Sequence, residues 1–132
     1  RKNMKLDKIL AEISAGELID KITILEIKKE KIKDPIKNKE VNKELYSLNQ
    51  TFKKYISNPS GINKLIVDLK NINLKLWDIE DGKRTFEKDN NFGNDFIELA
   101  RNVYKFNDLR AKVKFEINKT LGSNIREVKS YK

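Results

Sequence analysis

The chain contains no cysteine and no histidine, which excludes two large classes of site. Without cysteine there is no disulfide and no thiolate-bound zinc or iron–sulfur cluster, a composition that fits a reducing compartment. Without histidine there is no imidazole metal ligand and no side chain that titrates near neutral pH by default. Catalysis would have to use carboxylates, lysine, tyrosine or arginine, together with an oxygen-bound cation such as magnesium. We therefore expect a cytoplasmic protein without a cofactor.

Long apolar segments are missing as well. No apolar run approaches the roughly 18 to 20 residues that a membrane helix requires, and the N-terminus lacks the apolar core of a signal peptide. The length of 132 residues is typical of one domain that can bury its own core. The sequence thus predicts a single domain over residues 1–132 with no membrane partner.

Basic residues, in contrast, are abundant: 29 Lys and Arg oppose 20 Asp and Glu, which gives a net charge of +9. The excess is largest over residues 28–54, where nine lysines stand against four acids. Such a charge suggests nucleic acid or an acidic partner. Arginine, which reads bases and phosphates best, is absent from this stretch. We therefore favour solvated helix faces, with nucleic-acid binding through the Lys-rich face of the first two helices as an alternative.

Apolar residues recur every three to four positions in four stretches, and no stretch alternates with period two for long enough to predict a sheet. Ser14 and Glu17 have the spacing of a capping box, which predicts that a helix begins near residue 15. A residue before proline is driven out of the helical region, so this helix ends before Pro35. The expected helices cover about residues 15–33, 36–56, 61–88 and 92–121.

Four amphipathic helices with short connections predict an all-α fold, an antiparallel four-helix bundle. The third and fourth helices would each be roughly 40 Å long at 1.5 Å per residue, and together they would form a long helical hairpin that dominates the bundle. Helices longer than the rest of a bundle often complete their cover in a dimer. A homodimer is therefore expected.

Arginine is scarce, since only five of the 29 basic residues are Arg, and three of the five lie in the two helices of this hairpin. A position that keeps Arg in a lysine-dominated chain suggests a need for the planar, five-donor guanidinium. If the hairpin turns near residue 90, Trp77 lies opposite Tyr104 and Glu80 opposite Arg101, so that two polar bands meet. We call this junction the arginine seam. Its candidate ligand-binding residues are Arg84, Arg101, Arg110, Trp77, Tyr104, Asn107 and Asp108.

Arg110 falls inside the apolar stripe of its helix, between Phe106 and Val113. A buried guanidinium left unpaired costs several kcal/mol, so an acid must lie beside it. The candidate acids are Glu17, Asp20, Glu26 and Asp81. The favoured interpretation is a structural ion-pair network, formed by Glu17, Asp20, Lys21, Glu80, Asp81, Arg101 and Arg110. The alternative is a partly open pocket that binds an anionic small molecule between aromatic walls.

A third interpretation starts from acids spaced three residues apart on single helices. Such pairs on facing helices can hold magnesium in all-α nucleotide pyrophosphohydrolases. The Glu-Glu-x-x-Glu element usual in those enzymes is missing from this chain. Under this alternative, a magnesium-dependent enzyme acting on phosphorylated substrates, the ligands would be Glu17, Asp20, Asp78 and Asp81.

Five stretches combine these polar residues with the helical pattern: residues 13–25, 76–81, 99–104, 107–110 and 127–131. Together they resemble a family of small uncharacterised all-α proteins found in bacteria and phages. The resemblance implies a domain of unknown function, and it implies that the polar residues of these stretches belong to the family's pattern. Those residues are Glu17, Asp20, Lys21, Trp77, Glu80, Arg101, Tyr104, Asn107, Asp108, Arg110, Glu127, Lys129 and Tyr131. Because three of them lie in the tail, we predict that residues 123–132 pack back onto the seam.

The sequence as a whole contains no motif that fixes a reaction. We therefore predict a non-catalytic binding or assembly module, which recognises an anionic small molecule or a partner protein through the arginine seam.

Overall fold

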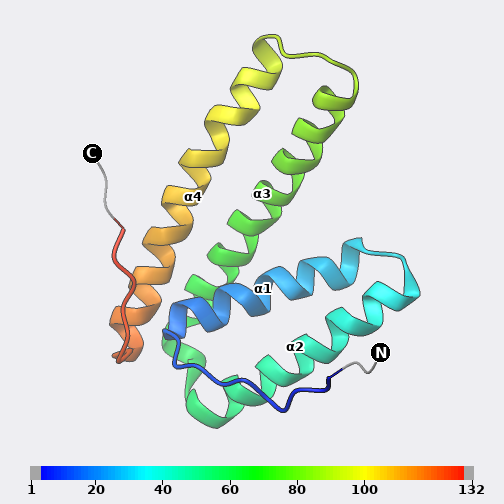
Figure 1. Cartoon of the computed structure of the whole chain (residues 1–132). Coiled ribbons are helices and arrows are strands. Elements are labelled where there is room, and N and C mark those ends of the chain that lie inside the picture. Colours follow the sequence, from blue (N-terminus) through cyan, green and yellow to red (C-terminus); the bar gives the residue numbers. More distant parts are fainter. Residues whose placement is uncertain (1–3, 130–132) are drawn as a thin grey trace.

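The computed structural model describes residues 4–129 and contains four α-helices and one short 3-10 helix. No strand occurs within this part of the chain, which confirms the predicted all-α class. α3 and α4 form the long antiparallel hairpin and share the most extensive contact of any helix pair (Figure 1). The elements are α1 (Ala15–Lys31), α2 (Pro35–Tyr55), η1 (Pro59–Ile62), α3 (Asn63–Lys88) and α4 (Asn94–Leu121).

Local signals explain where α1 and α2 begin and end. The Ser14 hydroxyl accepts a hydrogen bond from the Glu17 amide at 3.0 Å, as an N-cap does. The reciprocal half of the expected capping box is not made, because the Glu17 carboxylate binds a side chain of α4 instead. α1 ends at Lys31, two residues earlier than expected, since Ile32 is already extended. Asp34 caps α2, and Pro35 occupies its first turn, where a missing N–H costs nothing.

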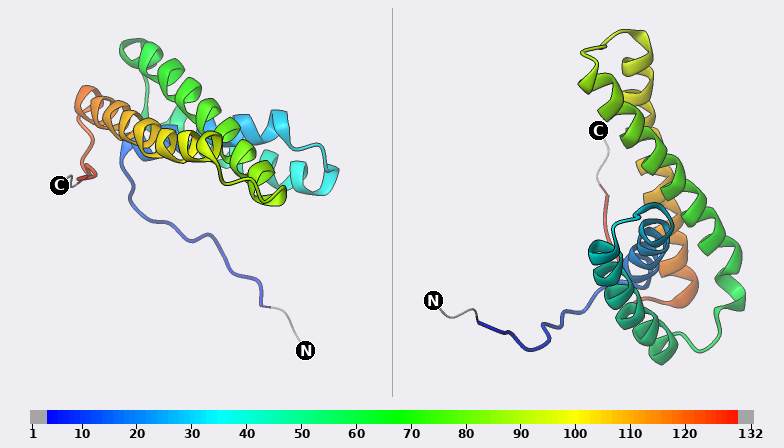
Figure 2. Two further views of the ribbon diagram at one scale, coloured as in Figure 1. Left: turned by 90° about the horizontal axis from the view of Figure 1, so that it is seen from above. Right: turned by 90° about the vertical axis from the view of Figure 1, so that its right-hand side faces the viewer.

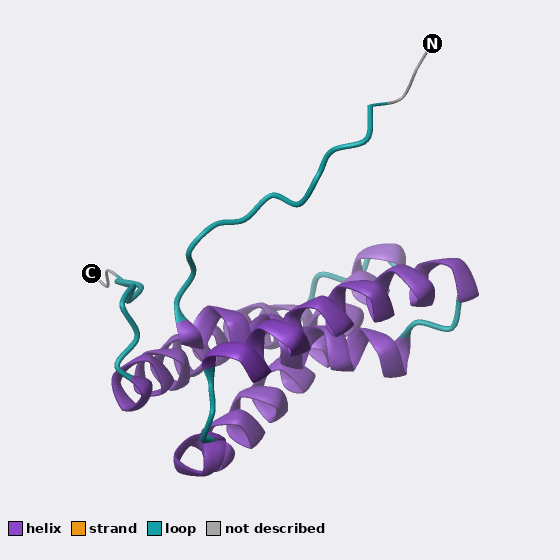
Figure 3. Ribbon diagram, turned by 90° about the horizontal axis from the view of Figure 1, so that it is seen from below, coloured by secondary structure: helices purple, strands orange, loops and turns teal. Residues whose placement is uncertain are grey.

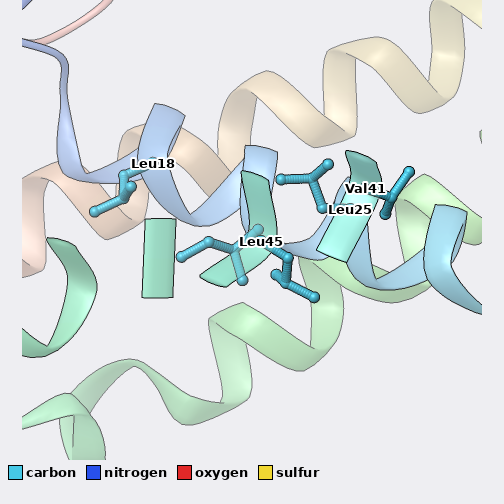
Figure 4. Packing of buried hydrophobic residues seen from close by; sticks show 5 residues of the cluster. Leu18, Leu25, Val41 and Leu45 are labelled. Carbon is cyan, nitrogen blue, oxygen red and sulfur yellow. The ribbon is translucent and has the colours of Figure 1, made fainter. Parts of the chain in front are cut away.

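α1 is the central helix of the fold. It contacts α2 on one side and both helices of the long hairpin on the other, whereas the backbone of α2 approaches neither α3 nor α4 closely (Figure 1). One apolar cluster lies between α1 and α2 (Figure 4) and a second joins α1 to η1, α3 and α4. Each large apolar side chain so buried contributes about 1.5–3 kcal/mol. The first cluster comprises Leu18, Ile22, Leu25, Val41 and Leu45, and the second Ile19, Ile62, Leu69 and Ile117.

The far end of the hairpin extends beyond α1 and α2 (Figures 1 and 2). We call residues 82–103 the hairpin tip. None of these residues is buried, and even the apolar stripe of Phe86, Phe96 and Leu99 is only half-buried. The helices approach closely at Gly82, where a Cβ would lie 2.9 Å from the Leu99 Cδ1 atom. The tip is therefore a two-helix layer with no third helix on it.

Both ends of the described chain lie outside the helices. Residues 4–13 run as an extended arm away from the body (Figures 2 and 3), and they present large apolar side chains to solvent. After α4, Gly122 adopts the left-handed conformation of a C-cap and turns the chain back along α4. Tyr131, which belongs to the predicted pattern of the tail, lies outside the described residues. None of the helices within residues 4–129 has the length and hydropathy of a membrane-spanning helix.

Candidate functional site

A buried carboxylate, that of Asp20, lies at the centre of the candidate site. It is fully buried on α1, and it accepts hydrogen bonds from the Arg110 Nε atom at 2.9 Å and from the Arg110 Nη2 atom. The Asn73 amide of α3 donates to the same carboxylate at 2.9 Å. Of the four acids that the sequence offered as partners for Arg110, the structure therefore selects Asp20. This contact joins α1, α3 and α4.

The surroundings of Asp20 compensate for the burial of its charge. Thr23 donates to the Asp20 backbone carbonyl at 2.7 Å and accepts from the Asn73 amide at 2.9 Å, so each polar group in this part of α1 has a partner. A buried ion is tolerated only when it is paired in this way. The hydrogen bond that Arg110 donates to Asp20 raises the pKa of Arg110 and outweighs the desolvation that lowers it. The guanidinium therefore stays charged.

Lys114 forms the second half of the network, one turn further along α4. Its side chain is 12% exposed, and its Nζ atom donates to Glu17 at 2.7 Å and to Glu127 at 3.2 Å. Burial lowers the pKa of Lys114, but the hydrogen bond to Glu17 and the nearby carboxylates raise it above its ordinary value. The other Glu127 oxygen accepts from the Ser14 hydroxyl at 3.2 Å. The tail is thereby attached to the start of α1 and to α4.

A glycine allows α1 and α4 to approach this closely. A Cβ on Gly16 would lie 2.6 Å from the Lys114 carbonyl oxygen, a distance that real structures do not show. The Gly16 amide donates to the Asn118 Oδ1 atom at 2.6 Å, and the Ala15 amide donates to the Ser123 hydroxyl at 3.1 Å. Three backbone N–H groups at the start of α1 are thus satisfied by side chains, which include that of Ser14.

Sequence reasoning left several of these residues out of the network, namely Ser14, Gly16, Asn73, Lys114, Asn118 and Ser123. The glycine in the first turn of a predicted helix was the available signal, because glycine there costs helix stability unless another backbone approaches it.

Other predicted members of the ion-pair network lie elsewhere. Lys21 is 3.9 Å from Glu17 on the edge of the network. Glu80 pairs with Lys83 of its own helix at 3.4 Å, and Asp81 and Arg101 are exposed. Their distance from the network has a simple cause: α1 crosses the hairpin at Asn73 and Arg110, about two helical turns below Glu80.

A cleft of about 390 Å³ opens where α1, α3 and α4 cross, and we call it the crossing cleft. Its apolar wall includes Ile24 and Ile27 of α1 and Val103 of α4. Four predicted ligand-binding residues line it: Trp77, Arg84, Asn107 and Arg110. Glu80 and Asp81 also line it, so cations and carboxylates share one concave surface with the tryptophan.

A second cleft, of about 650 Å³, lies between α4 and residues 127–129, and we call it the tail cleft. It shares Asn107 and Arg110 with the crossing cleft and adds Asp108 from the predicted set. Arg101 and Tyr104 are exposed on α4 and line neither cleft. The sequence-predicted ligand residues are thus divided between two clefts on either side of Arg110, with two of them outside both.

The proposed magnesium ligands do not gather. Within residues 4–129 no group of three or more acidic side chains is placed to hold a metal ion. Glu17 and Asp20 are bound to Lys114 and Arg110, while Asp78 is exposed on α3. The lysines of residues 28–54 are nearly all exposed on the end of α1 and along α2, on the outer layer of the fold.

Comparison with known families adds one finding. A model described as a family of unknown function (DUF6165) matches residues 9–132. The searches of curated proteins and of solved structures gave no match to this chain.

Proposed function

The chain belongs to the DUF6165 family of unknown function, and since that membership assigns no activity, we propose from the geometry that this protein is a non-catalytic binding module for an anionic small molecule held in the crossing cleft. The observation that carries the proposal is the position of Arg84. It lines the cleft together with Trp77, and no carboxylate of residues 4–129 lies within ion-pair distance of its guanidinium. A charged group beside an aromatic wall is suited to a ligand that offers both an anion and a flat or apolar part.

Arg110 supports the proposal in a different way. Asp20 fixes its Nε and Nη2 atoms, and within the described chain no other acceptor contacts it. Because Arg110 lines the cleft, the remaining donors of its fork are available to a ligand there, in an orientation set by a buried carboxylate. Such preorganisation lowers the entropic cost of binding.

The acids of the cleft narrow the choice of ligand. Asp81 is exposed and Glu80 is bound to Lys83, so the α3 wall one turn before Arg84 accepts hydrogen bonds and repels a second anion. Lys28 of α1 adds a cation to the same surface. The ligand we favour has one anionic group beside hydroxyl or amine donors, as sugar phosphates and hydroxylated acids do.

Trp77 makes the test direct, because it is the only tryptophan in the chain. Titration with nucleotides, sugar phosphates and dicarboxylates should produce a saturable change in its fluorescence for one class, with a matching rise in melting temperature. Arg84→Gln should weaken that binding at least tenfold, as expected for loss of a hydrogen bond to a charged group.

Arg101→Gln is the matched control, since this exposed arginine lies on the neighbouring helix and outside the cleft. Its affinity for the ligand should equal that of the wild type. Equal affinities of the wild type and Arg84→Gln would contradict the proposal, as would the absence of any fluorescence change across the three classes.

The bare hairpin tip supports a second candidate function, assembly of two copies. The tip carries four basic and four acidic side chains, so the entire net charge of +9 lies on the rest of the chain. A neutral surface of mixed charge can pair with a copy of itself without the repulsion that the basic body would impose. Pairing of two tips would complete a four-helix arrangement and cover Phe96 and Leu99.

Light scattering after size exclusion tests this second candidate. The wild type should show twice the 15.5 kDa mass of one chain, and Ile97→Glu, at an exposed position of the tip, should return it to one chain. Val67→Glu is the control, because Val67 is exposed on α3 away from the tip. A monomeric wild type would contradict this candidate, and so would dissociation caused equally by both variants.

A further inference from the structure

The tail cleft has features that the crossing cleft lacks. It is the larger of the two, at about 650 Å³, which is within the range of sites for drug-sized ligands. Its walls include Leu109 and Phe115 of α4 and Val128 of the tail, all of them large apolar side chains that are exposed. An exposed apolar surface inside a concave cleft indicates a place for an apolar molecule.

The charges around these apolar side chains are strongly unbalanced. Five cations and two acids line the cleft. The cations are Lys105, Arg110, Lys112, Lys114 and Lys129, and the acids are Asp108 and Glu127. A surface of this kind favours a ligand whose apolar part ends in a negative charge.

One buried donor in the cleft has no acceptor. Asn118 lines the cleft and is 1% exposed, and its Oδ1 atom accepts from the Gly16 amide at 2.6 Å. That bond fixes the orientation of the Asn118 side-chain amide, because the backbone N–H of Gly16 can donate only to its oxygen and not to its nitrogen. The Nδ2 atom is then buried, and no hydrogen-bond acceptor is available to it among the described residues. Leaving such a donor unpaired costs about 1–3 kcal/mol, which an incoming oxygen would recover.

The protein already places a carboxylate of its own in this cleft. Glu127 is half-exposed on the tail, and its oxygens are bound to Lys114 and Ser14 at 3.2 Å each. These two residues therefore form a carboxylate-binding pair, and the pair is occupied from within the chain. Because an ion pair with an exposed partner is worth only about 0.2–1 kcal/mol, an external carboxylate can displace Glu127.

We propose that the tail cleft binds a small apolar carboxylic acid, whose carboxylate replaces that of Glu127 on Lys114 and Ser14 and accepts a hydrogen bond from Asn118. The apolar part of the acid lies against Leu109 and Phe115 and beneath Val128. Glu127 is an internal competitor in this arrangement, so the affinity for the acid is set partly by the tail.

The experiment uses the full chain and decanoate, below its micelle-forming concentration, with decanol as the uncharged match. Binding is followed by ¹⁵N–¹H NMR, in which the side-chain amide of Asn118 gives its own pair of signals. Decanoate should shift this pair and the amides of residues 109–118 saturably, and decanol should bind at least tenfold more weakly. Equal affinities of decanoate and decanol would overturn the proposal.

Three variants distinguish competition by Glu127 from a general attraction of decanoate to surface lysines. Glu127→Gln should tighten decanoate binding about threefold, since it removes a competitor held by a weak ion pair. Lys129→Gln at the exposed rim should weaken binding about twofold. Lys64→Gln, which alters an exposed lysine of α3 outside the cleft, should leave it unchanged. Unchanged or weaker binding by Glu127→Gln, or equal losses in the two lysine variants, would overturn the proposal.

The tail cleft shares Asn107 and Arg110 with the crossing cleft, and the variant Arg84→Gln distinguishes the two sites. The variant should bind decanoate as the wild type does, because Arg84 does not line the tail cleft. Loss of decanoate binding in Arg84→Gln would place the acid in the crossing cleft, which would overturn this proposal and leave the proposed function standing.

Discussion

Replacing Asp20 by asparagine tests the centre of the network directly. The substitution keeps the size of the side chain but removes the charge that holds two nitrogen atoms of Arg110. Breaking a buried ion pair by removing one partner costs about 3–5 kcal/mol, because the other charge stays buried without compensation. The Arg110 side chain is 30% exposed and can recover part of its hydration. We therefore expect a loss near the lower end, about 3 kcal/mol.

The assay is urea denaturation followed by far-UV circular dichroism, with a thermal scan beside it. A loss of about 3 kcal/mol lowers the melting temperature of a domain of this size by about 10 °C and leaves the protein folded at 25 °C. Asp78→Asn is the control, because Asp78 is an exposed acid of α3, and its change should be within about 0.5 kcal/mol.

A double-mutant cycle with Arg110→Met isolates the pair. If the cost of Asp20→Asn comes from an orphaned guanidinium, the doubly substituted chain should be more stable than the sum of the single losses predicts, by about 1–3 kcal/mol. Additive losses would refute the reasoning, as would a single Asp20→Asn variant within 1 kcal/mol of the wild type.

Three further outcomes follow from the same network and its flanking turn. Gly16→Ala should lower the free energy of unfolding by about 1–3 kcal/mol, because the added Cβ meets the Lys114 carbonyl. Gly61→Ala is the control and should change the stability little, since an added Cβ there has no atom within 4 Å. Equal effects of the two variants in urea melts would contradict this reasoning. Lys114→Met should lower the free energy of unfolding by a constant amount from pH 7 to 9. That loss should shrink as the pH rises through the Lys114 pKa, which lies above its ordinary 10.5, because a raised pKa stabilises the fold only while the ammonium is charged. A pH-independent difference between the two proteins in melts up to pH 11 would argue against the ion pair. Gly122→Ala should cost about 1 kcal/mol, since φ is 63° there, and Gly122→Asn should recover much of it in the same thermal scan.

The helices themselves were accessible from the sequence, because caps and prolines are local signals. Ser14, Asp34 with Pro35, and Gly122 act on the backbone within a few residues, so they limit where a helix can begin or end whatever packs against it. The short η1 turn was missed, because a single 3-10 turn after Asn58 leaves no periodic pattern to read.

The order of the layers could have been read from α1 but was not. This helix has apolar side chains on opposite faces, with Leu18 and Leu25 toward α2 and Ile19 toward the hairpin. A helix with apolar side chains on two opposite faces can pack on both of them, which is the signature of a central element.

The site depended on distances that a sequence does not contain. Four acids were possible partners of Arg110, and the choice of Asp20 follows from the point at which α1 crosses the hairpin. That point is set by Gly16, whose missing side chain admits the backbone of α4. Arg101 and Tyr104 were expected at the seam, yet both are exposed, since α1 crosses the hairpin at Arg110, before α4 reaches back to them.

The central position of α1 also sets how freely its sequence can vary. Eight of its 17 residues are buried, and they serve the apolar clusters on both sides of the helix and the ion-pair network on the hairpin side. Glu17 and Lys28, which are only partly covered, are engaged with Lys114 or line the crossing cleft. A saturation mutagenesis of this chain would therefore find α1 the least tolerant helix and the outer face of α2 the most tolerant, so tags, fluorophores and surface immobilisation belong on α2.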